Sequence, residues 1–275
     1  MLIKEYRIAM PMTSKEYNLA QLYMVAKASQ EESGQQAGEG IEIVRNEPYD
    51  SKSPLNRHDM PPGQYTEKVM YLKSKLPKFV AMLVPDSMTN ITEYSWNAFP
   101  RCKTVYRNAY FGDKFVMSVD TMHADDRGTQ QNAVNLPPAD MAKRKVEYMN
   151  IACEDSSIPM EKGENPTQFL SKKTGRGNLK PTFLEDHDPI MTCYKVVKLR
   201  FKVFGLQTKV EQWGHHYGMK VPLLKCHRKL FCWIDEWFGL GIDNIRAMEE
   251  ETARITKVKI EDSLKASEVG AIAAS

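Results

Sequence analysis

Two lysines lie where the strand periodicity of the sequence otherwise places apolar side chains. Residues 63–72 follow a proline-rich turn and are rich in β-branched and aromatic types, which predicts a strand. Because alternate residues of a strand share a face, one face carries Thr66, Lys68, Met70 and Leu72. If that face is buried, the Lys68 ammonium requires an anion. In the alternative interpretation the face of Tyr65 is the core and Lys68 is solvated.

The second lysine lies in residues 191–204, the strongest predicted strand. Lys195 shares a face with Cys193, Val197 and Leu199. Two more predicted strands, 101–108 and 114–123, add hydroxyl groups to comparable rows, with Thr104 beside Cys102 and Thr121 beside Val119. Two ammonium groups and several hydroxyls together suit a phosphate, and the apolar neighbours suit hydrocarbon. The pattern favours a phospholipid-sized cavity over a polar catalytic cleft.

A carboxylate in the C-terminal part is a candidate for the other end of such a ligand. Ile242, Ile245, Glu249 and Thr252 recur at helical spacing. This spacing places Glu249 in an apolar stripe, where it could accept hydrogen bonds from a sugar-like headgroup, while Glu250 and Glu251 turn away. A solvated acidic helix face is the alternative interpretation.

A sheet must position these residues. Alternation and turn residues predict strands over residues 2–10, 41–46, 63–72, 91–99, 101–108, 114–123, 146–152 and 191–204. The first helix is predicted from a capping box at Thr13 and Glu16 to about residue 34. Short helices are predicted over residues 77–84 and from residue 138, and longer ones over residues 221–238 and 242–259. Residues 155–189 are polar and predict a long surface excursion.

These elements predict an α+β fold, a curved antiparallel sheet that encloses a lipid cavity and is closed by helices, including a long C-terminal one. We expect a single domain over residues 1–275, with a frayed tail from about residue 266.

Composition limits the classes of function. The chain of 275 residues has a net charge of +3, too small to indicate nucleic acid, although mild basicity suits transient contact with an anionic membrane. Five cysteines without a CxxC pair indicate a reducing compartment. No apolar run is long enough to cross a bilayer, so we expect a cytoplasmic protein.

Catalytic motifs are not found in the sequence. It has no GxSxG elbow, phosphate-binding Walker loop or HExxH pair. Its six histidines lack zinc spacing, and His215 and His216 are interpreted as a helix surface pair. We predict no metal, cofactor or catalytic residue. A cysteine–histidine nucleophile stays open, since its partners in space are not visible in sequence.

The sequence resembles the phosphatidylinositol transfer protein family. The matching stretches are IKEYR at 3–7, QLY at 21–23, NEPY at 46–49, GQYTEK at 63–68, WNA at 96–98, KTGRG at 173–177, GLQ at 205–207, FCW at 231–233 and MEEET at 248–252. The resemblance extends to about residue 257. It implies a fold similar to the steroidogenic-acute-regulatory lipid-binding domains, with one phospholipid held headgroup-inward under a C-terminal helical lid.

The resemblance also implies roles for individual residues. Inositol-contacting positions match Thr66, Lys68, Asn97 and Glu249. Phosphate-contacting positions match Gln21, Thr104, Thr121 and Lys195. Cys102 matches a cavity cysteine, Ser171 a phosphorylatable loop serine, and Val203 and Phe204 the exposed Trp-Trp pair that contacts membranes.

Features of two branches of the family are combined. Residues 1–13 are similar to the retinal-degeneration-B branch, whereas Cys102 is similar to the single-domain branch. The second ligand is therefore phosphatidylcholine or phosphatidic acid. We expect a monomeric, non-enzymatic carrier, peripheral on membranes, that exchanges phosphatidylinositol and this second lipid. The alternatives are a lipid hydrolase and a lipid sensor that does not exchange.

Overall fold

The protein is built on one mixed sheet. The computed structural model describes residues 1–33, 39–82, 84–85 and 88–273, without the side chains of residue 32 and of residues from 263 on. Within this part the strand order is β2-β3-β4-β5-β6-β8-β1-β7. The strands are β1 Leu2–Met10, β2 Gly40–Tyr49, β3 Gly63–Tyr71, β4 Ile91–Ala98, β5 Arg101–Arg107, β6 Phe115–Ala124, β7 Lys145–Met149 and β8 Met191–Phe201.

Strand pairing is antiparallel from β2 to β1, as predicted, and β7 joins β1 in parallel. Two strands of a sheet that run in the same direction and follow each other along the chain need a long crossover connection. β6 and β7 are such a pair: the segment between them passes over β8 and β1, and it places β7 parallel to β1. The sheet is therefore mixed only at this edge.

The helices pack on both faces of the sheet, most of them on one face and α3 on the other. They are α1 Ser14–Glu32, α2 Lys78–Ala81, α3 Pro138–Met141, α4 Phe183–Asp186, α5 Gln207–Trp213, α6 Val221–Cys232, α7 Ile234–Trp237 and α8 Ile242–Ala273, with 3-10 turns η1 Lys73–Lys75 and η3 Gly112–Lys114 and the π-helix η4 Gly214–Lys220. The capping box at the start of α1 is confirmed: Thr13 Oγ1 accepts from the Glu16 amide at 3.2 Å, and the Thr13 amide donates to Glu16 at 2.8 Å.

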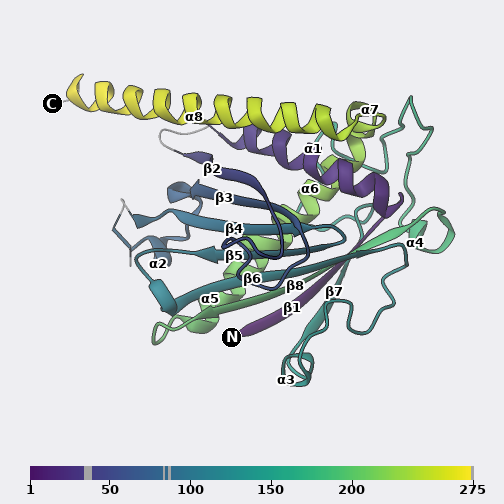
Figure 1. Ribbon diagram of the computed structural model, residues 1–275, viewed down its shortest axis with the longest axis horizontal. Coiled ribbons are helices and arrows are strands. Elements are labelled where there is room, and N and C mark those ends of the chain that lie inside the picture. The colour runs from purple at the N-terminus through teal and green to yellow at the C-terminus, as the bar shows by residue number, and fades with distance from the viewer. Residues whose placement is uncertain (34–38, 83, 86–87, 274–275) are drawn as a thin grey trace.

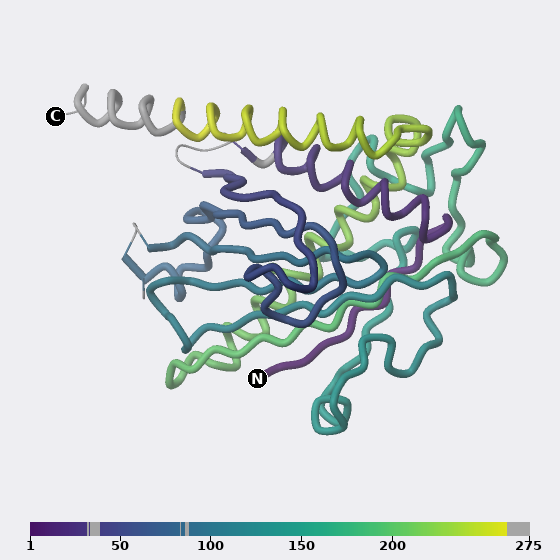
Figure 2. Tube along the Cα trace, in the orientation of Figure 1, coloured from purple at the N-terminus to yellow at the C-terminus, as the bar shows by residue number. Residues whose placement is uncertain are grey.

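The long helix α8 runs beside α1 and past the β2 edge of the sheet (Figure 1). Gln30 of α1 donates to Thr252 of α8 at 2.7 Å, and Thr252 and Thr256 are fully buried. Segments near opposite ends of the described chain are thus side by side (Figure 2). The resemblance implied a C-terminal helix that acts as a lid over the lipid, and α8 lies against α1 and β2.

The main hydrophobic core lies between the sheet and the helices. It joins Val119 and Val197 of the sheet to Tyr17 of α1 and Phe231 of α6. We call this helix-covered side of the sheet the inner face. The opposite, outer face has smaller clusters, one of which packs Tyr65 against Trp96.

Several sequence-based boundaries are corrected. The helical region after the sheet begins at Gln207, before the predicted residue 221, and includes the π-helix. His215 is fully buried, so it is not a surface residue: its ring lies 3.1 Å from the Tyr6 hydroxyl. The excursion after β7 contributes buried Ile158 and Phe183 to the core. The C-terminal helix, predicted over residues 242–259, extends to Ala273. The frayed tail from about residue 266 stays a prediction.

Candidate functional site

Three neighbouring rows of side chains cross the inner face. Register aligns the first as Lys68, Glu93, Tyr106, Met117 and Leu199. The second is Thr66, Ser95, Thr104, Val119 and Val197, and the third is Gln64, Asn97, Cys102, Thr121 and Lys195. Opposed residues of paired strands point to the same side. The seven sheet positions singled out in the sequence therefore share one face.

Lys68 has its anion within the protein. Its Nζ lies 3.9 Å from Glu93, and their side chains are only 12% and 17% exposed. Lys68 is thus not solvated, although Tyr65 on the opposite face is buried as well. Burial, followed by the charge of Glu93, raises the pKa of neighbouring Tyr106 well above its usual value. This end of the inner face is poorly hydrated.

A cluster of hydroxyl and thiol groups lies in the next rows. The Ser95 hydroxyl is 3.3 Å from Thr104 Oγ1 and 3.6 Å from Cys102 Sγ. The Oδ1 atom of Asn97 is buried and has no hydrogen-bond partner among the described residues. An unsatisfied buried acceptor disfavours the empty site, so this amide is suited to a ligand hydroxyl.

Lys195 occupies the other end of these rows. Its Nζ donates to Thr121 Oγ1 at 3.5 Å. Within the described part of the chain, no carboxylate forms an ion pair with it. Gln21 of α1 lies one helical turn after Tyr17, on the same helix side, and Tyr17 packs 5.0 Å from the His123 ring on the inner face.

Two neutral histidines surround Lys195. Burial first, and the Lys195 charge second, lower the pKa of His123 to about 3 and that of His227 to about 4. Since His227 Nδ1 donates to the Leu223 carbonyl at 2.6 Å, its Nε2 accepts from the Tyr17 hydroxyl at 2.9 Å. Neither histidine adds a positive charge at neutral pH, and an anionic ligand at this end would lie beside Lys195.

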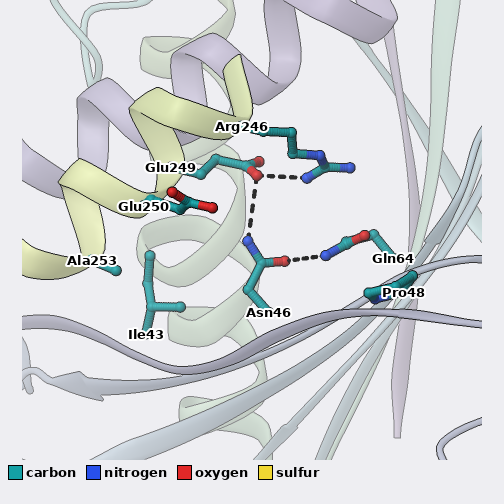
Figure 3. A pocket seen from close by; sticks show the side chains of 8 residues that line it. All are labelled: Ile43, Asn46, Pro48, Gln64, Arg246, Glu249, Glu250 and Ala253. Carbon is teal, nitrogen blue, oxygen red and sulfur yellow. Dashed lines mark hydrogen bonds and ion pairs between the residues drawn. The ribbon is translucent and has the colours of Figure 1, made fainter. Parts of the chain in front are cut away.

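A pocket of about 330 Å³ opens between α8 and strands β2 and β3 (Figure 3). Its lining residues are Ile43, Asn46, Pro48, Gln64, Arg246, Glu249, Glu250 and Ala253. Asn46 Nδ2 donates to Glu249 at 3.4 Å, and Arg246 pairs with the same carboxylate at 2.5 Å. Glu250 also borders this pocket, and its side chain is exposed.

The remaining candidates lie elsewhere. In the turn between β8 and α5, Val203 packs on a small hydrophobic cluster, whereas the Phe204 side chain is fully exposed. The predicted strand of 191–204 ends at Phe201, before these residues. Ser171 is buried below α7, where its hydroxyl donates to Asp235 at 2.5 Å.

Groups for other chemistry are not assembled in the described residues. No set of three or more histidine, cysteine or acidic side chains is arranged for a metal ion there. Burial raises the pKa of Cys193, the cysteine next to Tyr17, which disfavours a nucleophilic thiolate. None of the helices described is both long and apolar enough to span a membrane.

Sequence comparison identifies the family. The family profile described as phosphatidylinositol transfer protein matches residues 1–254. The chain belongs to the phosphatidylinositol transfer protein family. The predicted resemblance and α+β fold are thereby confirmed.

Members of this family from distant organisms align over most of the chain. Phosphatidylinositol transfer protein 2 of Dictyostelium discoideum is 47% identical, over 96% of this chain and 98% of its own length. Cytoplasmic phosphatidylinositol transfer protein 1 of Xenopus tropicalis is 41% identical, over 94% and 76%. The phosphatidylinositol transfer protein beta isoform of Homo sapiens is 39% identical, over 92% of each chain.

Sequence reasoning missed four polar residues of the site: Glu93, Ser95, Asn46 and Gln64. Glu93 and Ser95 alternate with outer-face residues in a predicted strand, so the same periodicity that selected Lys68 could have identified them. Gln64 shares its strand face with Thr66 and Lys68, so the same alternation indicated it as well. Asn46 had no such signal, because the register of its strand shifts between Ile43 and Arg45.

Proposed function

We propose that this protein carries phosphatidylinositol and a second phospholipid between membranes. The observation that supports it most is the set of three rows on the inner face, in a member of a lipid transfer family. A half-buried surface that combines Lys68, Lys195 and several hydroxyls, framed by apolar side chains, suits a phospholipid with its headgroup inward.

The two ends of these rows suit different parts of the ligand. Lys195, Thr121, Thr104 and Gln21 would bind the phosphate, because Lys195 forms no carboxylate ion pair within the described residues. Thr66, Lys68, Asn97 and Glu249 would bind the inositol hydroxyls, and Cys102 would line the cavity between the two groups. Carboxylates and amides, which accept hydrogen bonds, are concentrated at this second end.

Carrying a lipid requires an apolar space. Burying methylene groups contributes about 0.8 kcal/mol each, so two acyl chains of about 30 methylenes represent roughly 24 kcal/mol. A lipid leaves a bilayer at a useful rate only if the protein offers equivalent surroundings. Met117 and Leu199, which flank the polar rows, would contact the acyl chains.

Membrane contact would use the end of the sheet near Phe204. A groove of about 420 Å³ beside it is lined by Tyr110, Phe111, Lys114 and Val203. Exposed aromatic groups next to exposed lysines match the chemistry of an anionic membrane surface. We infer a transient, peripheral association of a monomeric cytoplasmic protein, in keeping with the word cytoplasmic in the name of the Xenopus relative.

In this proposal the protein is not an enzyme. It binds a phospholipid as its ligand and needs no cofactor. A hydrolase would require an activated nucleophile, and a sensor would bind without exchange. The second ligand is phosphatidylcholine or phosphatidic acid.

A transfer assay separates these functions. Purified protein is mixed with donor vesicles that contain labelled phosphatidylinositol and with unlabelled acceptor vesicles. We expect intact labelled lipid in the acceptor and one phospholipid per protein by native mass spectrometry. Lys198→Ala, on the outer face, is the control that should transfer normally. Release of inositol phosphate would support a hydrolase, and binding without transfer would support a sensor.

A further inference from the structure

Asn46 connects two strands to the C-terminal helix across the pocket of Figure 3. Its Oδ1 accepts a hydrogen bond from Gln64 at 2.8 Å and lies 3.5 Å from the Thr66 hydroxyl. Its Nδ2 donates to Glu249 of α8 at 3.4 Å. One amide thus joins Thr66 and Glu249, two positions for which the family resemblance implies inositol contact.

A β-bulge gives Asn46 this orientation. The β2–β3 register shifts between Ile43 and Arg45, so that Ile43 lies opposite Lys68 and Asn46 lies opposite Thr66. Ile43 and Asn46 are an odd number of residues apart and would face opposite sides of a regular strand. The bulge brings both to the same side, and bulges commonly redirect a side chain near a functional site.

Glu249 is held through one of its two oxygens. Asn46 and Arg246 both donate to Oε2. In the described part of the chain, Oε1 has no hydrogen bond or ion pair, and the side chain is 15% exposed. Charge-assisted contacts of this kind fix a carboxylate in one orientation. The free oxygen keeps its lone pairs for a donor in the pocket.

We propose that Asn46 and Arg246 are positioning residues that set the headgroup specificity of this protein. They orient Glu249 so that a ligand hydroxyl can donate to its free oxygen, and the amide of Asn46 orients the Thr66 hydroxyl from the other side. This inference rests on the proposed function. A polyol headgroup would thereby bridge α8 and β2, closing the helix over the site.

Headgroups without hydroxyl groups gain nothing from this arrangement. A choline group has no N–H or O–H donor, and phosphatidic acid has no group beyond its phosphate. Loss of either positioning residue should therefore reduce phosphatidylinositol binding and spare the second lipid. A role confined to stability would affect both lipids equally.

The test compares transfer of phosphatidylinositol with that of phosphatidylcholine or phosphatidic acid, whichever the wild-type protein moves. Asn46→Ala and Arg246→Met should each lower phosphatidylinositol transfer about tenfold, as expected for lost hydrogen bonds to a charged group. Arg246→Lys should retain most activity. The matched control is Arg254→Ala on the same helix, where an arginine pairs with Glu251 but is 68% exposed.

A double-mutant cycle tests whether Asn46 acts through Glu249. In a Glu249→Ala background, Asn46→Ala should reduce phosphatidylinositol transfer by a smaller factor than in the wild-type protein, because only its contact with Thr66 remains to be lost. Equal losses of both lipids in Asn46→Ala, or the same factor in both backgrounds, would overturn the inference. If the wild-type protein transfers no phosphatidylinositol, the proposed function itself fails, which this design distinguishes from failure of the two positioning roles.

Discussion

Lys195 and Thr121 lie opposite each other on β8 and β6, and the Lys195 ammonium donates to the threonine hydroxyl at 3.5 Å. Lys68, on the same face, instead lies 3.9 Å from the Glu93 carboxylate. Two lysines selected by the same sequence pattern thus differ in their partners. Lys68 has a carboxylate partner within the protein, whereas Lys195 has none among the described residues.

Replacing these lysines should have effects that differ by lipid. Lys195→Ala should weaken both lipids, because losing one partner of a buried charge pair costs about 3–5 kcal/mol. Lys68→Ala should mainly reduce phosphatidylinositol transfer. Delipidation should lower the melting temperature of the wild-type protein more than that of Lys195→Ala. The measurements are transfer of each lipid by each mutant and thermal melts of lipid-loaded and lipid-free protein. If both mutants lost transfer of the two lipids in equal proportion, separate phosphate and inositol roles for the two lysines would be contradicted.

Thr66→Glu should abolish phosphatidylinositol transfer and leave the second lipid largely unaffected. A carboxylate at this position would lie beside Asn46 and close to Glu249, where it would repel that carboxylate and crowd a headgroup. The measurement is transfer of each lipid from the same vesicles. Thr92→Glu, on the outer face of β4, is the matched control; loss of both lipids only in Thr66→Glu would indicate a structural role for Thr66.

Replacing Val203 and Phe204 together by alanine should weaken vesicle association and slow transfer of both lipids. The Phe204 ring is fully exposed, so its removal costs the folded protein little. Sedimentation with anionic vesicles and transfer rates at several vesicle concentrations measure the effect. Tyr217→Ala removes an exposed aromatic group from η4 and should change neither quantity. Unaltered transfer in the double mutant would argue against this contact.

A negative charge at Ser171 should loosen the segment below α7. The Ser171 hydroxyl is the main cause of the lowered pKa of Asp235, and the Lys172 and Lys173 amides donate to the same carboxylate. Ser171→Glu would place two carboxylates together at a buried position, so we expect a lower melting temperature and faster proteolysis of residues 171–177. Ser157→Glu is the control, since Ser157 also donates to an aspartate but is exposed.

Acid should destabilise the protein through His123 and His227. Their pKa values in the folded state, about 3 and about 4, lie below the usual value near 6.5. The unfolded chain therefore binds more protons than the folded protein between these limits, and stability falls as the pH falls from about 6.5 to about 4. Each histidine contributes up to about 1.4 kcal/mol per pH unit.

Urea unfolding at several pH values measures this dependence. His123→Asn keeps a donor for the Pro100 carbonyl, to which His123 Nδ1 now donates at 2.9 Å. It should remove the His123 contribution, up to about 1.4 kcal/mol per pH unit, from the slope between pH 6 and pH 4. A slope equal to that of the wild-type protein would mean that His123 accepts its proton without unfolding.

Sequence periodicity was sufficient to group residues by face. Lys68, Thr104, Thr121 and Lys195 were selected because side chains alternate along a strand, and they do share the inner face. The partner of each lysine was not predictable, since it depends on strand register. Glu93 opposes Lys68 only because β3 and β4 pair in one particular alignment.

Departures from regular geometry explain the other omissions. The bulge in β2 puts Asn46 on the side that alternation from Ile43 excludes. In the π-helix, whose turn is wider than that of an α-helix, His215 points to β1 and its Nε2 contacts the Leu2 carbonyl at 3.2 Å. Neither irregularity has a period that a sequence pattern reveals.

The position of α8 at the end of the element order also has a consequence for synthesis. The eight strands of the described chain, with Lys195 and Thr121, are synthesised before α8, and Glu249 follows them. A nascent chain that ends after α7 already contains the phosphate-side residues but lacks the carboxylate that would contact inositol. In the proposed assignment, complete headgroup recognition therefore requires a residue that is synthesised after every sheet residue of the candidate site.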